Sequence, residues 1–374
     1  MPTLTRREVL AMLGAAAVAP AKEAPTAPVA VARCHTYDQE MVTALSTLMD
    51  QIGGLDRLVK NKTVTIKLNL TGSPGLKVQG KPLGLTHYTH PSVVEASLAL
   101  LDRAGARRIR LVESCWATGG LLEEYMLDSG WRVRRLQSAS SKVEFENTNA
   151  LGLGKRYSRL KVPGGGHMFP AYDLNHSYED TDVFMTIAKL KNHATCGVTL
   201  SLKNSFGITP ASIYGDDAGV DEPNEQPTKG RSAVMHAGRR PPASCAPGEL
   251  RPGSSKDPGY RVPRVVADLA ASRPIDLAII DGIETIAAGE GPWIRGVFPV
   301  SPGLLIAGTN PVTTDAVATA IMGYDPQADR GVAPFQTCDN TLKLAEDHGV
   351  GTTDLKRIEV RGLSIQQARF QFPA

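Results

Sequence analysis

The sequence of 374 residues has only five cysteines, and none of them forms a CxxC pair. This spacing argues against a zinc ribbon and against the cysteine runs that hold iron–sulfur clusters, so we expect no iron–sulfur cluster. The odd count and wide spacing also argue against a dense disulfide framework and leave open a single long-range bridge. The cysteines are Cys34, Cys115, Cys196, Cys245 and Cys338.

Several catalytic signatures are missing as well. The chain has no GxxxxGK[ST] phosphate loop, no GxSxG nucleophile elbow and no HExxH zinc motif, and LGLGKRY at 151–157 does not complete GxGxxG. A net charge of +3 is too small to argue for nucleic acid as a partner. No apolar run is long enough to cross a bilayer, so we expect no stable membrane span in the mature chain.

The N-terminal residues 1–21 resemble a twin-arginine (Tat) signal peptide. Arg6 and Arg7 precede an apolar stretch from Val9 to Ala19, and Ala19-Pro20-Ala21 offers an A-x-A-like cleavage site. The alternative is an incidental basic, amphipathic N-terminus. If the segment is a signal, the Tat machinery is a partner and the mature chain is periplasmic or extracellular.

The remaining chain, 22–374, predicts one α/β domain with a mostly parallel sheet flanked by helices, because strand-like and helix-like apolar patterns alternate. The expected strands are 63–70, 108–114, 131–137, 182–191, 276–284, 303–309 and 357–362. The expected helices are 91–106, 121–130, 311–323 and 341–349.

A long insertion at 216–263 interrupts this pattern. It is dense in Pro, Gly, Ser and charged residues. So long a polar stretch inside a compact domain is typical of a functional lid or a mobile insertion, and the alternative is a surface loop without a role.

The segment AKLKNHATCGVTLSLKNSFGITP at 188–210 carries the first candidate site. Between positions 183 and 215 the only formal charges are Lys189, Lys191 and Lys203. Lysines without a partner are costly to bury, so we expect these to face water or an anion, with His193 and Asn204 beside them. The alternative is an edge strand whose lysines prevent aggregation.

Two further sets of residues join this segment. Lys67 and Asn69 lie at the expected carboxyl end of a strand, where open α/β sheets bind ligands, although a solvated strand face is equally compatible. Carboxylates at strand ends and beside glycine turns suit a divalent metal or acid–base chemistry, and a helix-capping role is the alternative for Asp315. These carboxylates are Glu113, Asp281, Glu290 and Asp315. His87 and His90 are weaker candidates for a metal or an anion.

Five segments, taken in order, resemble the DUF362 family, a domain of unknown function. They are VTIKLNL, THPSVVEASLALLDRAGARRIRLVES, the lysine segment, DGIETIAAGEGPW and GTNPVTTDAVATAIMGYDP. The resemblance covers roughly residues 62 to 330. It implies that the matching positions belong to one site, and it supplies no reaction. Some relatives carry ferredoxin-like cysteine runs, which this chain lacks. The matching positions are Lys67, Asn69, Lys189, Lys191, His193, Lys203, Asn204, Asp281, Glu290 and Asp315.

We therefore expect an exported enzyme that acts on a small molecule bearing phosphate or carboxylate. Assistance of the reaction by a divalent metal is left open. The catalytic candidates are His193 as general acid or base, Lys191 and Asp281. The substrate-binding candidates are Lys67, Asn69, Lys189, Lys203 and Asn204. The metal candidates are Glu290, Asp315 and Glu113. The alternatives are a non-catalytic envelope protein that binds an anion or metal, and a structural envelope protein. Contact between His193 and an acidic residue in a closed pocket would favour catalysis.

Overall fold

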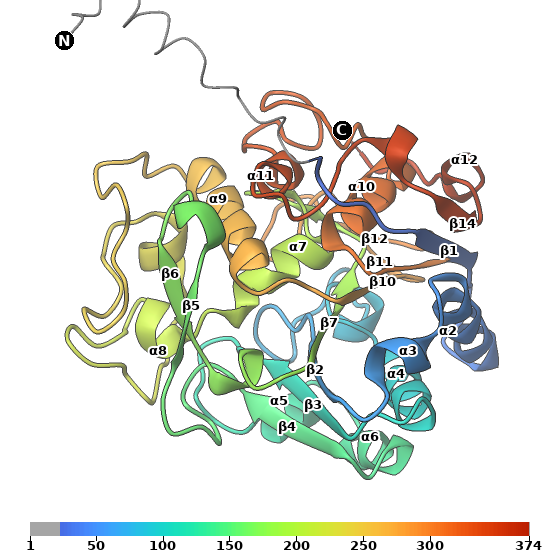
Figure 1. The fold of residues 1–374 in the computed structure, drawn as a ribbon, viewed down its shortest axis with the longest axis horizontal. Coiled ribbons are helices and arrows are strands. Elements are labelled where there is room, and N and C mark those ends of the chain that lie inside the picture. Colours follow the sequence, from blue (N-terminus) through green and yellow to red (C-terminus); the bar gives the residue numbers. More distant parts are fainter. Residues whose placement is uncertain (1–22, 374) are drawn as a thin grey trace, which may run out of the picture.

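The computed structural model describes residues 23–373, so the proposed signal peptide at 1–21 lies outside the described residues. An eight-stranded sheet in the order β14-β1-β13-β10-β7-β2-β3-β4 forms its centre (Figure 1). The pairings of β1 with β13 and of β10 with β13 are antiparallel, and the other five are parallel. The expected α/β fold with a mostly parallel sheet is confirmed. The strands are β1 (Val29–Arg33), β2 (Thr63–Lys67), β3 (Arg108–Glu113), β4 (Val143–Asn147), β7 (Val183–Lys189), β10 (Leu277–Gly282), β13 (Leu304–Gly308) and β14 (Val360–Gly362).

Helices cover both faces of this sheet. Successive strand residues point to opposite faces, so Ile279 packs in one hydrophobic cluster and Ile280 in the other. One face is covered by α2 (Gln39–Gln51), α3 (Leu55–Val59), α4 (Pro91–Arg103), α5 (Leu122–Asp128) and α6 (Val133–Ala139). The other face is covered by α7 (Leu200–Asn204), α8 (Ala211–Tyr214), α9 (Pro258–Ser272), α10 (Pro311–Ile321), α11 (Thr341–Asp347) and α12 (Ile365–Ala368) (Figure 1).

Three two-stranded sheets complete the fold. They are β5 (Ser158–Lys161) with β6 (Ala171–Leu174), β8 (Asn192–His193) with β9 (Gly197–Val198), and β11 (Thr285–Ala287) with β12 (Phe298–Val300). The hairpin of β8 and β9 follows directly after β7. It leads into α7, which packs back against β7 and β10.

One expected strand is wrong. Residues 131–137 were expected to be extended, yet Val133–Ala139 forms helix α6. Val133 and Leu136 are buried three residues apart, and the arginines between them are exposed. This spacing suits a helix, and the apparent alternation in WRVR is too short to specify a strand.

The insertion is shorter than expected and packs closely against the domain. Helix α9 begins at Pro258, so positions 258–263 are helical. Within the irregular part, a helical turn at Ser232–His236 buries Val234 and Met235 in the core. The Ala243 N–H also donates to the carbonyl of Ile213 at 3.1 Å. The segment is therefore attached to the fold at several points.

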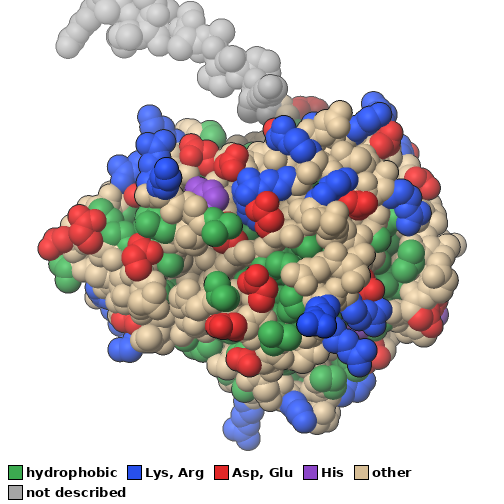
Figure 2. Space-filling view, turned by 90° about the horizontal axis from the view of Figure 1, so that it is seen from below, with side chains coloured by type: hydrophobic (Ala, Val, Ile, Leu, Met, Phe, Trp, Pro, Cys, Tyr) green, Lys and Arg blue, Asp and Glu red, His purple; other side chains and the backbone are tan. Residues whose placement is uncertain are grey.

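The surface shows no dominant charge on the face seen in Figure 2, where basic and acidic side chains are intermixed. Within residues 23–373, no helix combines the length and the apolar character needed to cross a membrane.

Candidate functional site

A cavity of about 430 Å³ lies at the carboxyl ends of β2, β3 and β7. Lys67 is the last residue of β2, Glu113 is the last residue of β3, and Lys191 follows β7 by two positions. Because these strands are parallel neighbours, their ends meet at one edge of the sheet. The cavity is lined by eight of the eleven predicted site residues, which are Lys67, Asn69, Glu113, Lys191, His193, Lys203, Asn204 and Glu290.

Lys67 and Glu113 form a buried ion pair on the cavity wall. The Lys67 ammonium also donates to the Leu68 carbonyl at 2.7 Å. The Glu113 carboxylate accepts the N–H of Leu70 at 2.8 Å and that of Ser114 at 2.9 Å. The two charges cancel, so this pair adds no net charge to the cavity.

Two asparagines connect β2 to α7. The Asn204 amide donates to Thr186 Oγ1 at 2.6 Å, and its oxygen accepts Asn69 Nδ2 at 3.0 Å. This orientation directs Asn69 Oδ1 away from Asn204. Asn69 Oδ1 is buried, and no hydrogen-bond partner for it exists among the described residues. A buried acceptor without a partner is costly, so this atom is suited to accept a hydrogen bond from a ligand.

Lys191 is almost fully buried and forms no ion pair with any described carboxylate. Its ammonium donates to the carbonyl of His87 at 2.7 Å. Burial lowers the pKa of Lys191 to about 7; nearby Glu290 opposes this shift, and Lys189 and Lys203 add to it. The amine therefore exists in both protonation states near neutral pH.

His193 presents a neutral imidazole to the cavity. Its Nδ1 accepts the N–H of Thr195 at 3.1 Å, which places the ring proton on Nε2. Burial and the positive charge of Lys203 hold the pKa of His193 well below its ordinary value. Among the described residues, no carboxylate hydrogen-bonds to this ring, so the contact that would have favoured a general acid or base is absent.

Lys203 and Arg231 add two further cations. The Lys203 ammonium lies 4.3 Å from the centre of the Phe206 ring. Arg231 donates to the Thr209 carbonyl at 2.7 Å and to Asn149 Oδ1 at 2.8 Å. With Lys67 neutralised, Lys191, Lys203 and Arg231 face one remaining carboxylate among the described lining residues, that of Glu290. The cavity is therefore electropositive.

The family model described as "Domain of unknown function (DUF362)" matches residues 64–320, more than half of the chain. The chain belongs to the DUF362 family. A thylakoid-associated protein of Synechocystis sp. is 26% identical over 313 residues, covering 80% of this DUF362 chain and 75% of the relative.

Among solved structures, a Thermotoga maritima protein matches the DUF362 chain with a TM-score of 0.36 and 14% sequence identity. The match covers 71% of this chain and 55% of that protein. The chain thus spans about half the length of this structural neighbour.

Lys189 and Asp281 do not line the cavity of the DUF362 chain. They are direct neighbours in the register of β7 and β10, and they form a fully buried ion pair at 2.7 Å. Lys189 also donates to the Gly84 carbonyl at 2.9 Å, and Tyr37 donates to Asp281 at 2.9 Å. The expectation that all three lysines lack an acidic partner is therefore wrong for Lys189, because its partner lies on a strand distant in sequence.

Asp315 is also outside the cavity lining. Its carboxylate accepts the N–H groups of Ser201 at 3.0 Å and Leu202 at 2.8 Å, at the start of α7. The Ser201 hydroxyl donates to it at 2.5 Å. Burial raises the pKa of Asp315 to about 7, and these hydrogen bonds oppose the shift. The geometry is that of the capping alternative, although the capped helix is α7 rather than the helix that carries Asp315.

The three carboxylates predicted for a metal are not brought together. Glu113 and Glu290 line the cavity, and Asp315 caps α7. Glu290 accepts the N–H of Ala194 and the indole N–H of Trp293, each at 2.9 Å. Every carboxylate oxygen of Glu113 and Glu290 already has a protein donor.

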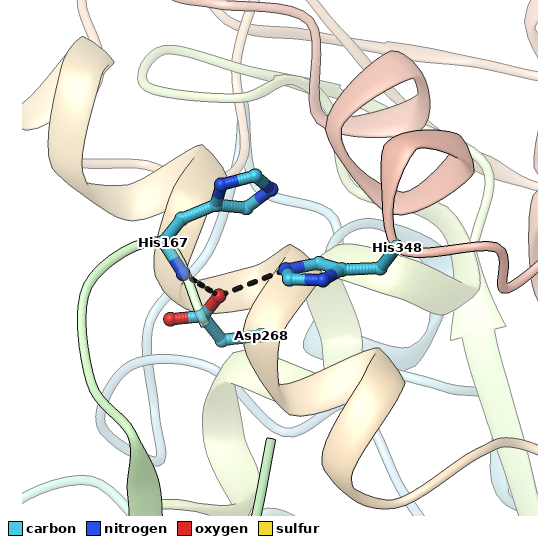
Figure 3. A group of neighbouring side chains, drawn as sticks. All are labelled: His167, Asp268 and His348. Atoms are coloured by element: carbon cyan, nitrogen blue, oxygen red, sulfur yellow. Dashed lines mark hydrogen bonds and ion pairs between the residues drawn. The ribbon is translucent and has the colours of Figure 1, made fainter. Parts of the chain in front are cut away.

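A different group, His167, Asp268 and His348, has side-chain atoms within 4.8 Å of one another (Figure 3). No local sequence pattern predicts this group, because its residues are far apart in the chain. Both oxygens of Asp268 already accept hydrogen bonds. The donors are the N–H of His167 at 2.6 Å, the N–H of Met168 at 2.8 Å, Tyr172 Oη at 3.1 Å and His348 Nε2 at 3.0 Å. Asp268 thus anchors the loop before β6, and the end of α11, to α9.

Five further lining residues were not predicted from the sequence: Arg231, Ser232 and His236 from the insertion, and Trp116 and Trp293. The insertion residues lie in a stretch without regular periodicity, so no local pattern indicates which of its side chains face inward. Both tryptophans follow predicted site residues closely, Trp116 after Glu113 and Trp293 after Glu290. Their proximity to those residues was the only available signal.

Proposed function

We propose that the DUF362 chain is an enzyme that binds a small phosphate- or carboxylate-bearing molecule in this cavity and uses the Lys191 amine to transfer a proton. The observation that carries the proposal is that Lys191, Lys203 and Arg231 line one cavity in which Glu290 is the one described carboxylate not paired with Lys67. An anionic group would offset this excess of positive charge. It would also accept hydrogen bonds from the remaining N–H groups of the Lys191 ammonium.

Lys191 is the group best suited to proton transfer. Its pKa of about 7 lets it accept or donate a proton near neutral pH, which general acid–base catalysis requires. Lys203 and Arg231 would stabilise negative charge that develops in the transition state. His193 takes a revised role, because a neutral ring with its proton on Nε2 is a hydrogen-bond donor rather than the general acid or base of the prediction.

Assistance by a divalent metal has less support, since the oxygens of Glu113 and Glu290 are already engaged. The second candidate is a binding protein without catalysis. It is favoured by the absence of an acidic partner for His193 among the described residues, and the same cavity and cations would serve it.

The proposed location is outside the cytoplasm after Tat export. Its support is the twin arginine and apolar segment of residues 1–21. The Synechocystis relative is described as thylakoid-associated, and a similar association of this chain with a membrane surface is compatible with such a location.

Isothermal titration calorimetry with inorganic phosphate and with acetate tests anion binding. We expect acetate, which is ionised at both pH values, to bind more tightly at about pH 6 than at about pH 8, because Lys191 carries its charge below a pKa of about 7. Lys203→Met and Arg231→Met should each weaken binding about tenfold or more. Lys356→Met, which removes an exposed lysine, is the matched control. Equal affinities in all four proteins would contradict the proposal.

A further inference from the structure

The cavity is lined by aromatic as well as cationic side chains. Trp116 and Trp293 both border it, and their exposed fractions are 42% and 46%. The third tryptophan, Trp131, is buried in the hydrophobic core and does not line the cavity. Large aromatic side chains left exposed beside a charged cavity leave apolar surface in contact with water.

Both tryptophan rings are supported by glycine backbone. A Cβ atom at Gly230 would lie 2.5 Å from the Trp116 ring, so this position cannot carry a side chain without moving the ring. A Cβ atom at Gly72 would lie 2.5 Å from the Trp293 ring, and one at Gly291 would also collide with it. The glycines therefore allow the rings to pack directly on the backbone.

Trp293 is also held at its polar edge. Its indole N–H donates to Glu290 at 2.9 Å, and its ring makes an edge contact with His87 at 5.7 Å between centroids. Gly230, which supports Trp116, directly precedes Arg231 in the chain. Trp293 is thus coupled to the Glu290 carboxylate, and Trp116 lies against the residue that precedes Arg231. An aromatic ring held in a fixed orientation loses little conformational entropy when a ligand packs on it.

From this arrangement we infer that the ligand is an aromatic acid: a planar ring that packs on Trp116 and Trp293, joined to a phosphate or carboxylate that contacts Lys191, Lys203 and Arg231. The inference rests on the proposed function and specifies its substrate class. A hydroxyl or amino group on the same molecule would satisfy Asn69 Oδ1, which is buried without a partner among the described residues. A cavity of about 430 Å³ accommodates a molecule of this size.

Calorimetry with three probes tests the inference: phenyl phosphate, cyclohexyl phosphate and inorganic phosphate. We expect phenyl phosphate to bind about tenfold more tightly than inorganic phosphate, with cyclohexyl phosphate between them, because stacking adds to apolar burial. Phenyl phosphate should also change the fluorescence of the exposed tryptophans.

Substitutions of the tryptophans test whether Trp116 and Trp293 cause the preference for phenyl phosphate. Trp116→Ala and Trp293→Leu should each remove most of the preference for phenyl phosphate over inorganic phosphate, with both affinities measured in the same variant. Trp293→Phe should retain the preference, since it keeps a ring. Trp131→Phe is the matched control and should bind all three probes as the unmodified protein does.

The outcomes separate the inference from the proposed function. If inorganic phosphate binds and phenyl phosphate binds no more tightly, the aromatic inference is overturned and the proposed function stands. If a preference for phenyl phosphate persists unchanged in both Trp116→Ala and Trp293→Leu, the inference is also overturned. If none of the three probes binds, both fail.

Discussion

At the residue scale, Lys191 is the most informative side chain. Burying a lysine ammonium near other cations destabilises the folded protein, because the charge loses its hydration and is repelled by its neighbours. The strands and the β8–β9 hairpin place it beside the cavity with one carbonyl partner, His87. The amount by which the Lys191 charge destabilises the ligand-free protein therefore measures how strongly the site favours a bound anion.

This cost predicts a pH-dependent stability difference for Lys191→Met. The pKa of Lys191 is lowered to about 7 in the folded state and lies near 10.4 in the unfolded chain. Between these values the unfolded chain binds more protons, so the stability of the unmodified protein rises with pH. The variant lacks this penalty, and we expect it to be more stable by about 2–5 kcal/mol at pH 6 to 7.

The difference should shrink towards about pH 10, where both states lose the charge. Urea unfolding of the two ligand-free proteins at several pH values measures it, with Lys356→Met as control. A difference that does not vary with pH would show that Lys191 is not held at a lowered pKa.

Asp281 provides a second residue-scale prediction, because its position in the β7–β10 register argues for a structural role. Asp281→Asn leaves the Lys189 ammonium buried without its counter-charge, and we expect a loss of about 3–5 kcal/mol in the free energy of unfolding. The double variant Lys189→Met with Asp281→Asn should recover most of it.

Thermal and urea unfolding measure both effects. Anion affinity, determined on the folded fraction, should stay within about twofold in the double variant, because neither residue lines the cavity. A double variant that is as unstable as Asp281→Asn alone, or that no longer binds, would contradict the structural role.

The sequence predicted that Lys67, Asn69 and Glu113 lie near one another at strand ends, and the structure places all three in the cavity lining. The sequence did not predict long-range pairing. Lys67 and Glu113 are the last residues of β2 and β3, and Asn69 follows β2 by two positions. The parallel order of these strands brings their ends together, and local patterns indicate such ends. The pairing of Lys189 with Asp281 depends on β7 and β10 being neighbours in register, which no local pattern specifies.

At the element scale, the insertion at 216–257 is the least regular part of the described chain and contributes directly to the cavity. Arg231, Ser232 and His236 belong to it, and Val234 and Met235 anchor the same turn in the core. A polar, Pro- and Gly-rich composition predicts an irregular segment correctly. This composition does not predict which apolar residues of the segment pack in the core.

Because Val234 and Met235 attach this turn to the core, we expect a core substitution in the turn to change both stability and anion binding. Met235→Ala should cost about 2–4 kcal/mol in the free energy of unfolding and should also weaken anion binding, because it loosens the turn that carries Arg231. Val220→Ala is the matched control, since Val220 lies in the same segment with an exposed fraction of 75%. Unfolding and calorimetry on both variants measure the two effects. Unchanged anion affinity in a destabilised Met235→Ala protein would argue against the coupling.

Helix α6 shows a similar limit at this scale. A strand was expected at 131–137 from four alternating residues, whereas burial of Val133 and Leu136 follows a helical spacing. The true strand, β4, begins at Val143. Short apolar patterns fit either period, and tertiary packing decides between them.

At the scale of the whole molecule, the parallel sheet was predictable because strand and helix patterns alternate along most of the chain. The antiparallel insertion of β13 between β1 and β10 was not, since strand order follows from packing between distant segments. Export remains a prediction that concerns the entire chain and residues outside the described ones.

Export can be tested by replacing Arg6-Arg7 with Lys-Lys. If the segment is a Tat signal, the replacement should strongly reduce the exported pool and leave precursor in the cytoplasm. Fractionation of cells that produce either chain, followed by immunoblotting, measures this. Replacement of Arg33, another arginine of the chain, by Lys serves as control. Equal amounts of exported protein from both twin-arginine forms would contradict the assignment.

The most direct test of the central claim is native mass spectrometry of the protein purified from its own host. The account predicts a bound small molecule in the unmodified protein, released on denaturation and identified as an acid, and its absence from the Lys203→Met and Arg231→Met variants. A protein that carries no such molecule, or variants that retain it fully, would contradict the claim that these cations form an anion-binding site.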